Sequence, residues 1–82
     1  MARMQTVDSS SIAAIGYDRA RRRLFVQFRD SGETYAYLGV PARLFAALKE
    51  APSKGRFVNA VIRDRYRYER VAAKPGSAPQ RR

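Results

Sequence analysis

The hydrophobic pattern of this chain changes its period at Val40-Pro41, and that change limits the folds open to it. Before this junction, apolar and polar residues alternate in short runs, which is the pattern of half-buried β-strands. After it, apolar residues recur three and four positions apart, which is the pattern of a helix with one face on a core. Proline is favoured in the first turn of a helix, because it fixes φ and no amide is needed there. The chain should therefore fold as strands first and helices second.

Three segments before the junction have the composition of strands. They are residues 12–17, 24–28 and 34–38. The second of them places Leu24, Val26 and Phe28 on one face. The turn before the third contains Gly32, which can adopt the positive φ of a tight reversal. We expect a three-stranded antiparallel meander.

Two short helices are expected after the junction. Pro52 should stop the first helix, and Ser53 suits the N-cap of the second, because its hydroxyl can accept a hydrogen bond from an amide of the first turn. Both helices should pack on one face of the sheet, which makes the fold α+β. Residues 67–71 alternate in polarity and fit either a final edge strand or a frayed continuation of the second helix.

The chain has 82 residues, which is enough for one small domain. We expect a flexible N-terminus at residues 1–8, a folded domain at 9–71 and a disordered basic tail at 72–82, where apolar side chains are too few to form a core. The first residues lack the apolar segment of a signal peptide, and no apolar run is long enough to span a bilayer. A cytoplasmic monomer that does not bind membranes is therefore expected.

The composition argues against catalysis. The chain has no cysteine and no histidine, so disulfides, thiolate metal sites and the usual general base at neutral pH are all missing. Its seven carboxylates are scattered through predicted turns and surfaces, so no pair is set up as an acid and a base or as a metal site. We expect no enzyme activity, no metal and no cofactor.

The charge points to a polyanionic partner. Lysine and arginine number 17 against 7 acidic residues, which gives a formal net charge of +10. Most of the basic residues are arginines, whose planar guanidinium suits bidentate contact with phosphate. The alternative is a solvated surface whose charge only keeps the protein soluble.

The predicted second helix carries a stripe of polar residues. It starts at Arg56 and continues three, seven and eleven positions later with Asn59, Arg63 and Arg67. On an unbroken helix these residues would form a basic row roughly 16 Å long. Such a row could contact several phosphates. Asn59 is a poor helix former, and it either bonds back to the helix or reads a base.

Lys54 lies at the start of the same helix, between Ser53 and Gly55. The amides of this turn could bind an anion, because they point outward from a helix N-terminus. The alternative, which we favour slightly, is an ordinary cap with a glycine that permits a tight joint between the two helices.

Aromatic side chains give two further candidates on the sheet. Tyr35 and Tyr37 share a face and either stack on bases or pack in the core, and we favour the core. Phe25 lies on the face opposite Leu24, next to Arg23, and so belongs to the side that the helices should leave open. If the tyrosines join Phe25 there, the sheet is a binding face.

Together these residues resemble the KTSC domain, a short module found alone in bacteria and phages and at the C-terminus of some lysyl-tRNA synthetases. The resemblance covers residues 7–71 and rests on the order and spacing of several short elements. These are Ser9-Ser10 with Ile12, Ile15-Gly16-Tyr17-Asp18, Leu24-x-Val26-x-Phe28, Tyr35-x-Tyr37, Val40-Pro41, and Ser53-x-Gly55-x-Phe57-x-Asn59 followed by Ile62-Arg63 and Tyr66. The resemblance implies a link to RNA, through the tRNA-handling enzyme to which the module is attached.

We therefore expect a small nucleic-acid-binding module, with RNA preferred over DNA because of the resemblance. Phosphate contacts should come from the Arg56, Arg63 and Arg67 row, from Lys54 and from the tail. The alternative belongs to another class of protein: an adaptor, of the kind phages carry, that docks an acidic protein partner on the open sheet face around Phe25.

Overall fold

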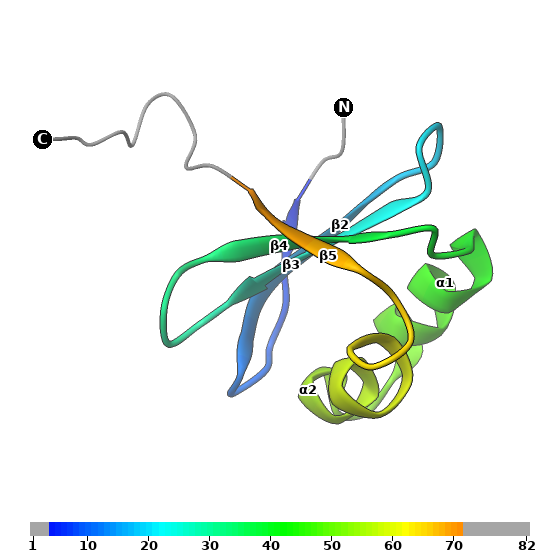
Figure 1. Cartoon of the computed structure of the whole chain (residues 1–82). Coiled ribbons are helices and arrows are strands. Elements are labelled where there is room, and N and C mark those ends of the chain that lie inside the picture. Colours follow the sequence, from blue (N-terminus) through cyan, green and yellow to red (C-terminus); the bar gives the residue numbers. More distant parts are fainter. Residues whose placement is uncertain (1–3, 72–82) are drawn as a thin grey trace, which may run out of the picture.

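The computed structural model describes residues 4–71 and contains one antiparallel sheet of five strands in the order β1-β2-β3-β4-β5 (Figure 1). Two helical segments are inserted between β4 and β5. The strands are β1 (Gln5–Thr6), β2 (Ile12–Asp18), β3 (Arg23–Phe28), β4 (Thr34–Leu38) and β5 (Tyr68–Val71). The helices are α1 (Ala42–Glu50) and α2 (Lys54–Phe57), and α2 continues into a π-helical turn, η1 (Val58–Ile62). The predicted α+β fold and its central meander are confirmed, and the predicted tail at 72–82 lies outside the described residues.

The two ends of the sheet add to the predicted meander. Residues 67–71 were open to two interpretations, and the structure places β5 beside β4 as an edge strand. At the other edge the sheet begins at Gln5, although we expected the folded part to begin at residue 9. This strand is only two residues long and has no apolar alternation, so its sequence carries no strand pattern. The guanidinium of Arg29 holds the following loop by donating to the carbonyl oxygen of Ser9 at 2.9 Å.

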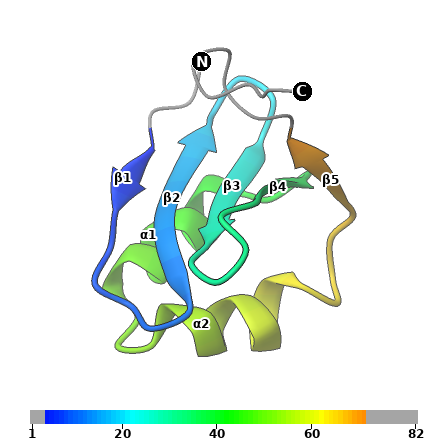
Figure 2. The same cartoon turned by 90° about the vertical axis from the view of Figure 1, so that its left-hand side faces the viewer.

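Both helical segments cover one face of the sheet, and in Figure 2 the strands lie side by side in front of α1. The core forms between this face and the helices. Leu24 and Val26 are fully buried there, as the alternation in β3 predicts. Leu48 from α1 and Ile62 from η1 close the core from the helix side. Phe25 is half-buried on the opposite face, which no helix covers.

The start of α2 is fixed by two small residues. The Arg56 amide donates to the Ser53 hydroxyl at 3.4 Å, so the predicted N-cap is confirmed. A Cβ atom on Gly55 would lie only 2.7 Å from the hydroxyl oxygen of Ser11, in the loop between β1 and β2. Gly55 is therefore required for close packing of α2 on that loop, rather than for the joint with α1.

The second helical segment ends earlier than an unbroken helix would. Its last turn is π-helical, with the Arg63 amide donating to the carbonyl oxygen of Val58 at 2.8 Å. The amides of Arg65 and Tyr66 then both donate to the carbonyl oxygen of Ile62, and this turn leads the chain back to the sheet. Each described helix is too short to cross a membrane.

Candidate nucleic-acid interface

Tyr35 and Tyr37 lie on the helix-facing side of β4. The register pairs Tyr37 with Leu24 and Tyr35 with Val26, and paired residues of neighbouring strands share a face. Tyr37 is only 2% exposed, so its ring belongs to the core. The two tyrosines therefore do not join Phe25, and the open face of the sheet is not an aromatic platform formed by these three rings.

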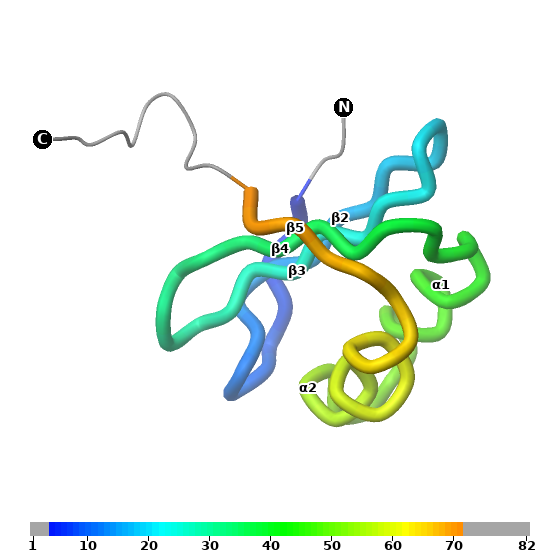
Figure 3. Tube along the Cα trace, in the orientation of Figure 1, coloured from blue at the N-terminus to red at the C-terminus, as the bar shows by residue number. Residues whose placement is uncertain are grey.

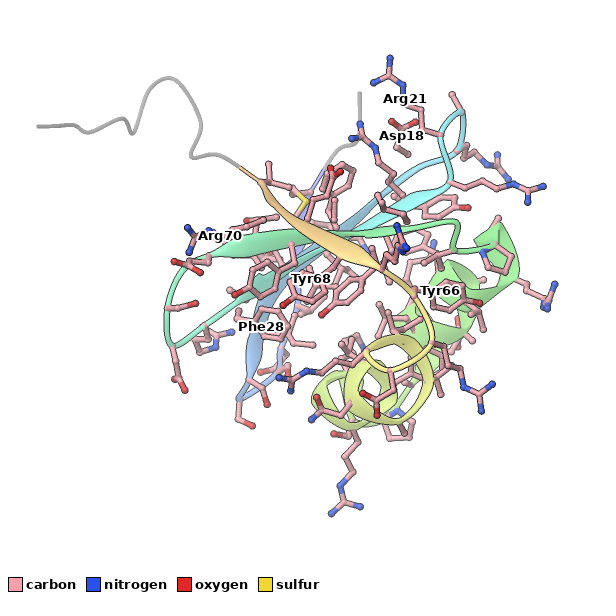
Figure 4. The ribbon with its side chains drawn as sticks, in the orientation of Figure 1. Asp18, Arg21, Phe28, Tyr66, Tyr68 and Arg70 are labelled. Carbon is pink, nitrogen blue, oxygen red and sulfur yellow. The ribbon has the colours of Figure 1, made fainter. Side chains whose placement is uncertain are left out.

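A row of aromatic rings crosses the sheet from Phe28 in β3, through Tyr35 and Tyr37 in β4, to Tyr68 in the edge strand β5. Ring centroids lie 5.5 Å apart between Phe28 and Tyr35, 5.1 Å between Tyr35 and Tyr68, and 5.7 Å between Tyr37 and Tyr68, all with tilted rings. Figure 4 shows Tyr68 and Phe28 on the side of the sheet that faces the C-terminal helical segment. Tyr68 is 57% exposed, so the row ends in an accessible ring. Sequence reasoning missed Tyr68 because its position depends on the pairing of β5 with β4.

This row forms one wall of a cleft of about 230 Å³ between the sheet and η1. The cleft is lined by Phe28, Ser31, Tyr35, Tyr37, Arg63 and Tyr68. We call it the aromatic cleft. It combines aromatic rings with a single cation, which is a combination suited to a planar ligand that carries negative charge.

Asn59 positions the cation of this cleft. Its side-chain oxygen accepts a hydrogen bond from Nη1 of Arg63 at 3.2 Å, one helical turn away. This bond explains why a poor helix former stands in the middle of the segment. The other N–H groups of the guanidinium remain available, because arginine has five donors.

A second charged pair borders the aromatic row. The Glu33 carboxylate accepts from the Tyr35 hydroxyl at 3.3 Å and pairs with Arg70 at 3.3 Å. The carboxylate thereby fixes the orientation of the Tyr35 ring. Arg70 offsets its charge at this edge of the sheet (Figure 4).

The Tyr37 hydroxyl is a neutral polar group within the cleft. Burial raises its pKa above the ordinary value, while the nearby Arg63 cation acts in the opposite direction and the neighbouring tyrosines add to the rise. The hydroxyl therefore stays protonated at neutral pH, and it can donate or accept a hydrogen bond.

The predicted basic row along the second helix is wrong at Arg67. The helical segment ends at Ile62, and Arg67 lies on the return to β5, where its carbonyl oxygen accepts from the Leu38 amide at 2.8 Å. The π-helical turn also holds more residues than an α-helical turn, so the spacing assumed from Arg56 to Arg63 does not apply. Arg56 and Arg67 are both exposed, and a contact of either with phosphate stays a prediction.

Lys54 is engaged within the fold. Its ammonium donates to the carbonyl oxygen of Ala51 at 3.1 Å, which satisfies a group at the end of α1. The side chain is half-buried, so Lys54 ties the two helices together at their junction.

Phe25 and Arg23 lie on the open face, as predicted. Phe25 is paired with Gly16 on one side and Ala36 on the other. The Arg23 guanidinium lies 5.3 Å above the Phe25 ring and also forms an ion pair with Asp18 at 3.4 Å. The Arg23 guanidinium, which we expected to contact a partner, thus packs over Phe25 and pairs with Asp18.

The hairpin between β2 and β3 presents exposed arginines that sequence reasoning treated only as a charged turn. They are Arg19, Arg21 and Arg22, and the hairpin, cyan in Figure 3, projects beyond the rest of the sheet. Arg22 adopts φ +54°, a conformation that disfavours residues with a Cβ atom. Its carbonyl oxygen accepts from the Val40 amide at 2.9 Å, which holds the hairpin against the start of α1.

Asp18 closes this hairpin. Its carboxylate accepts from the amides of Ala20 at 3.1 Å and Arg21 at 3.3 Å, and it pairs with Arg23. Desolvation acts to raise the pKa of this carboxyl, but the hydrogen bonds from Arg21, Arg23 and Ala20 act in the opposite direction, and the pKa lies below the ordinary value. Within residues 4–71, carboxylates do not gather into a group that could hold a metal ion.

Comparison with known proteins places this arrangement in a family. The model of the KTSC domain matches residues 8–66. A protein of Tsukamurella paurometabola is 47% identical over 64 residues, which span 78% of this chain and 94% of that protein. An uncharacterized protein of Stutzerimonas stutzeri is 42% identical over 66 residues, which span 79% of this chain and 92% of that protein.

Two further matches connect the chain to a solved structure and to a larger enzyme. The crystal structure of a KTSC domain protein from Yersinia pestis is 43% identical and aligns with a TM-score of 0.83, covering 88% of this chain and 100% of that one. A lysine-tRNA ligase of Nostoc punctiforme is 32% identical over 65 residues, which span 79% of this chain but 11% of the ligase.

The match to the family model extends from the loop before β2 to the turn after η1, and it leaves out the edge strands β1 and β5. The resemblance noted in the sequence is thereby confirmed. This chain belongs to the KTSC domain family.

Proposed function

We propose that this domain binds single-stranded RNA, mainly through contacts between exposed arginines and phosphates. One observation carries the proposal. Within residues 4–71 only two ion pairs form, Asp18 with Arg23 and Glu33 with Arg70. Exposed arginines whose side chains have no partner in this part of the chain are Arg19, Arg21, Arg22, Arg43, Arg56, Arg65 and Arg67. A surface with so many unpaired guanidinium groups attracts a polyanion.

Two features favour RNA as that polyanion. A matching segment occurs in a lysine-tRNA ligase, an enzyme whose name assigns it a tRNA substrate. In addition, the aromatic row ends in the accessible ring of Tyr68, and exposed aromatic rings next to cations are typical of proteins that bind unpaired bases.

The test is a salt titration with a fluorescent single-stranded RNA of about 8 nucleotides, a length within the usual range of small binding modules. Log affinity should fall linearly with log salt concentration, because bound cations release counterions from the RNA. Replacing Arg56, Arg65 and Arg67 together with glutamine should flatten that slope by about 0.7 for each arginine that contacts a phosphate.

The matched control replaces the exposed carboxylates Asp8 and Glu50 with their amides, a change that removes no cation. An unchanged slope in the arginine variant would exclude these residues from the interface. If the unaltered protein does not bind the RNA even at low salt, the proposal is contradicted. That result would favour the second candidate, docking of an acidic protein on the open face, where Arg23 lies over Phe25.

A further inference from the structure

We propose that the aromatic cleft is a binding site for one unstacked nucleobase, with Tyr68 stacking on the base and Arg63 contacting the adjacent phosphate. The inference rests on the proposed function and extends it, because phosphate contacts alone need no cleft. It places one base of the RNA in the aromatic cleft and assigns its recognition to stacking and to one phosphate contact.

The accessible ring of Tyr68 is the first observation. Among residues 4–71 the exposed large hydrophobic side chains are Tyr68 and Val71, and Tyr68 is the more exposed of the two at 57%. Its ring meets Tyr35 and Tyr37 at interplanar angles of 57° and 47°, so its neighbours hold it without stacking on it. A ring held in place and still open is prepared to stack on a planar ligand at little entropic cost.

The second observation is a polar group in the wall of the cleft. Tyr37 lines the cleft, although its ring lies in the core. Its hydroxyl can donate a hydrogen bond to the polar edge of a ligand in the cleft or accept one from it.

The size of the cleft suits a single ring system. Pockets for drug-sized ligands have volumes of about 300–1,000 Å³, and the aromatic cleft has about 230 Å³. One nucleobase fits within that volume. Arg63, held by Asn59 at 3.2 Å, supplies the cation that a nucleotide phosphate requires.

A base with its phosphate could come from an RNA chain or from a free nucleotide, and the experiment separates the two. Three probes are compared by competition: an abasic RNA chain of about 8 nucleotides, the same chain with one adenine, and adenosine monophosphate. The chain with one adenine should bind more tightly than the abasic chain, by roughly 5- to 150-fold, which is the usual effect of stacking one base. Adenosine monophosphate should compete weakly, because it makes one phosphate contact.

Single substitutions test which residues produce the preference for the adenine-containing chain. Tyr68→Ala should abolish the preference for the adenine-containing chain and leave binding of the abasic chain unchanged. The matched control is Val71→Ala, on the opposite face of the same strand, which should keep the preference. If Tyr68→Ala unfolds, Tyr68→Leu retains an apolar side chain without an aromatic face.

Tyr37→Phe should weaken the preference, whereas Tyr66→Phe, at a tyrosine outside the cleft, should not.

The outcomes distinguish this inference from the proposed function. Equal binding of the two chains would overturn the base site and leave phosphate binding intact. Loss of binding to both chains would overturn both proposals. Binding of adenosine monophosphate as tight as that of the chain would support the base site and assign it to free nucleotides, which would overturn its role in the RNA interface.

Discussion

Tyr37 has two roles, because its ring lies in the core and its hydroxyl lines the aromatic cleft. Replacing it with alanine should lower the free energy of unfolding by about 2–4 kcal/mol, as deletion of a large buried side chain does. Tyr37→Phe keeps the ring and should change stability by less than about 1.5 kcal/mol, since the hydroxyl lines the cleft rather than the core. Chemical denaturation of both variants checks this, and equal losses would contradict the separation of the two roles.

Asp18 makes the stability of the domain depend on pH in the acid range. Its pKa is lowered in the folded state, so its stabilising contribution is present above its unfolded pKa near 3.8 and is lost as the pH falls through the folded pKa. Asp18→Asn should therefore reduce stability at neutral pH and flatten the acid part of the stability curve.

The control for this prediction is Asp8→Asn, at an exposed carboxylate outside the hairpin. Unfolding free energies are measured for the three proteins from neutral pH down to about pH 3, where most carboxyls are protonated. Parallel curves for Asp18→Asn and the unaltered protein would show that the hairpin carboxylate does not contribute.

At the scale of elements, hydrophobic periodicity identified β2, β3, β4 and both helices, because each buries one face against the core. It could not identify β1, which has two exposed residues, or decide the state of β5, whose four residues are all exposed. The π-helical turn was also out of reach, because the apolar residues Phe57, Val58, Val61 and Ile62 have the spacing of an ordinary α-helix. The aromatic cleft could not be predicted from the sequence either, because it depends on Tyr68 in β5 and on Arg63 at the end of η1.

The joint between α2 and the loop after β1 gives a prediction at this scale. Gly55→Ala adds a Cβ atom that would lie 2.7 Å from the Ser11 hydroxyl oxygen and 3.2 Å from its Cβ atom. Alanine is the better helix former by about 1 kcal/mol, but the Ser11 hydroxyl must rotate away and its Cβ atom must give by a few tenths of an ångström, at a cost of about 1–3 kcal/mol. We expect a net loss of stability in thermal denaturation. Ser11→Gly in the same chain should recover it, and a stabilised Gly55→Ala variant would contradict this packing.

For the whole molecule, the two faces of the sheet differ in what they offer a partner. On the open face, Phe25 is covered by Arg23, which is itself paired with Asp18. On the helix side, the aromatic cleft opens at the edge formed by β5, with Arg63 inside it and exposed Arg65 and Arg67 in the connection between η1 and β5. We therefore propose that RNA lies along this edge, from the end of η1 to β5.

Amide chemical shifts of the protein, followed by NMR during titration with a short single-stranded RNA, test this placement most directly. Our account predicts the largest changes at Arg63, in the turn that follows it and at Tyr68, with small changes at Phe25. Changes centred on Phe25 and Arg23, or no change at any amide, would contradict it.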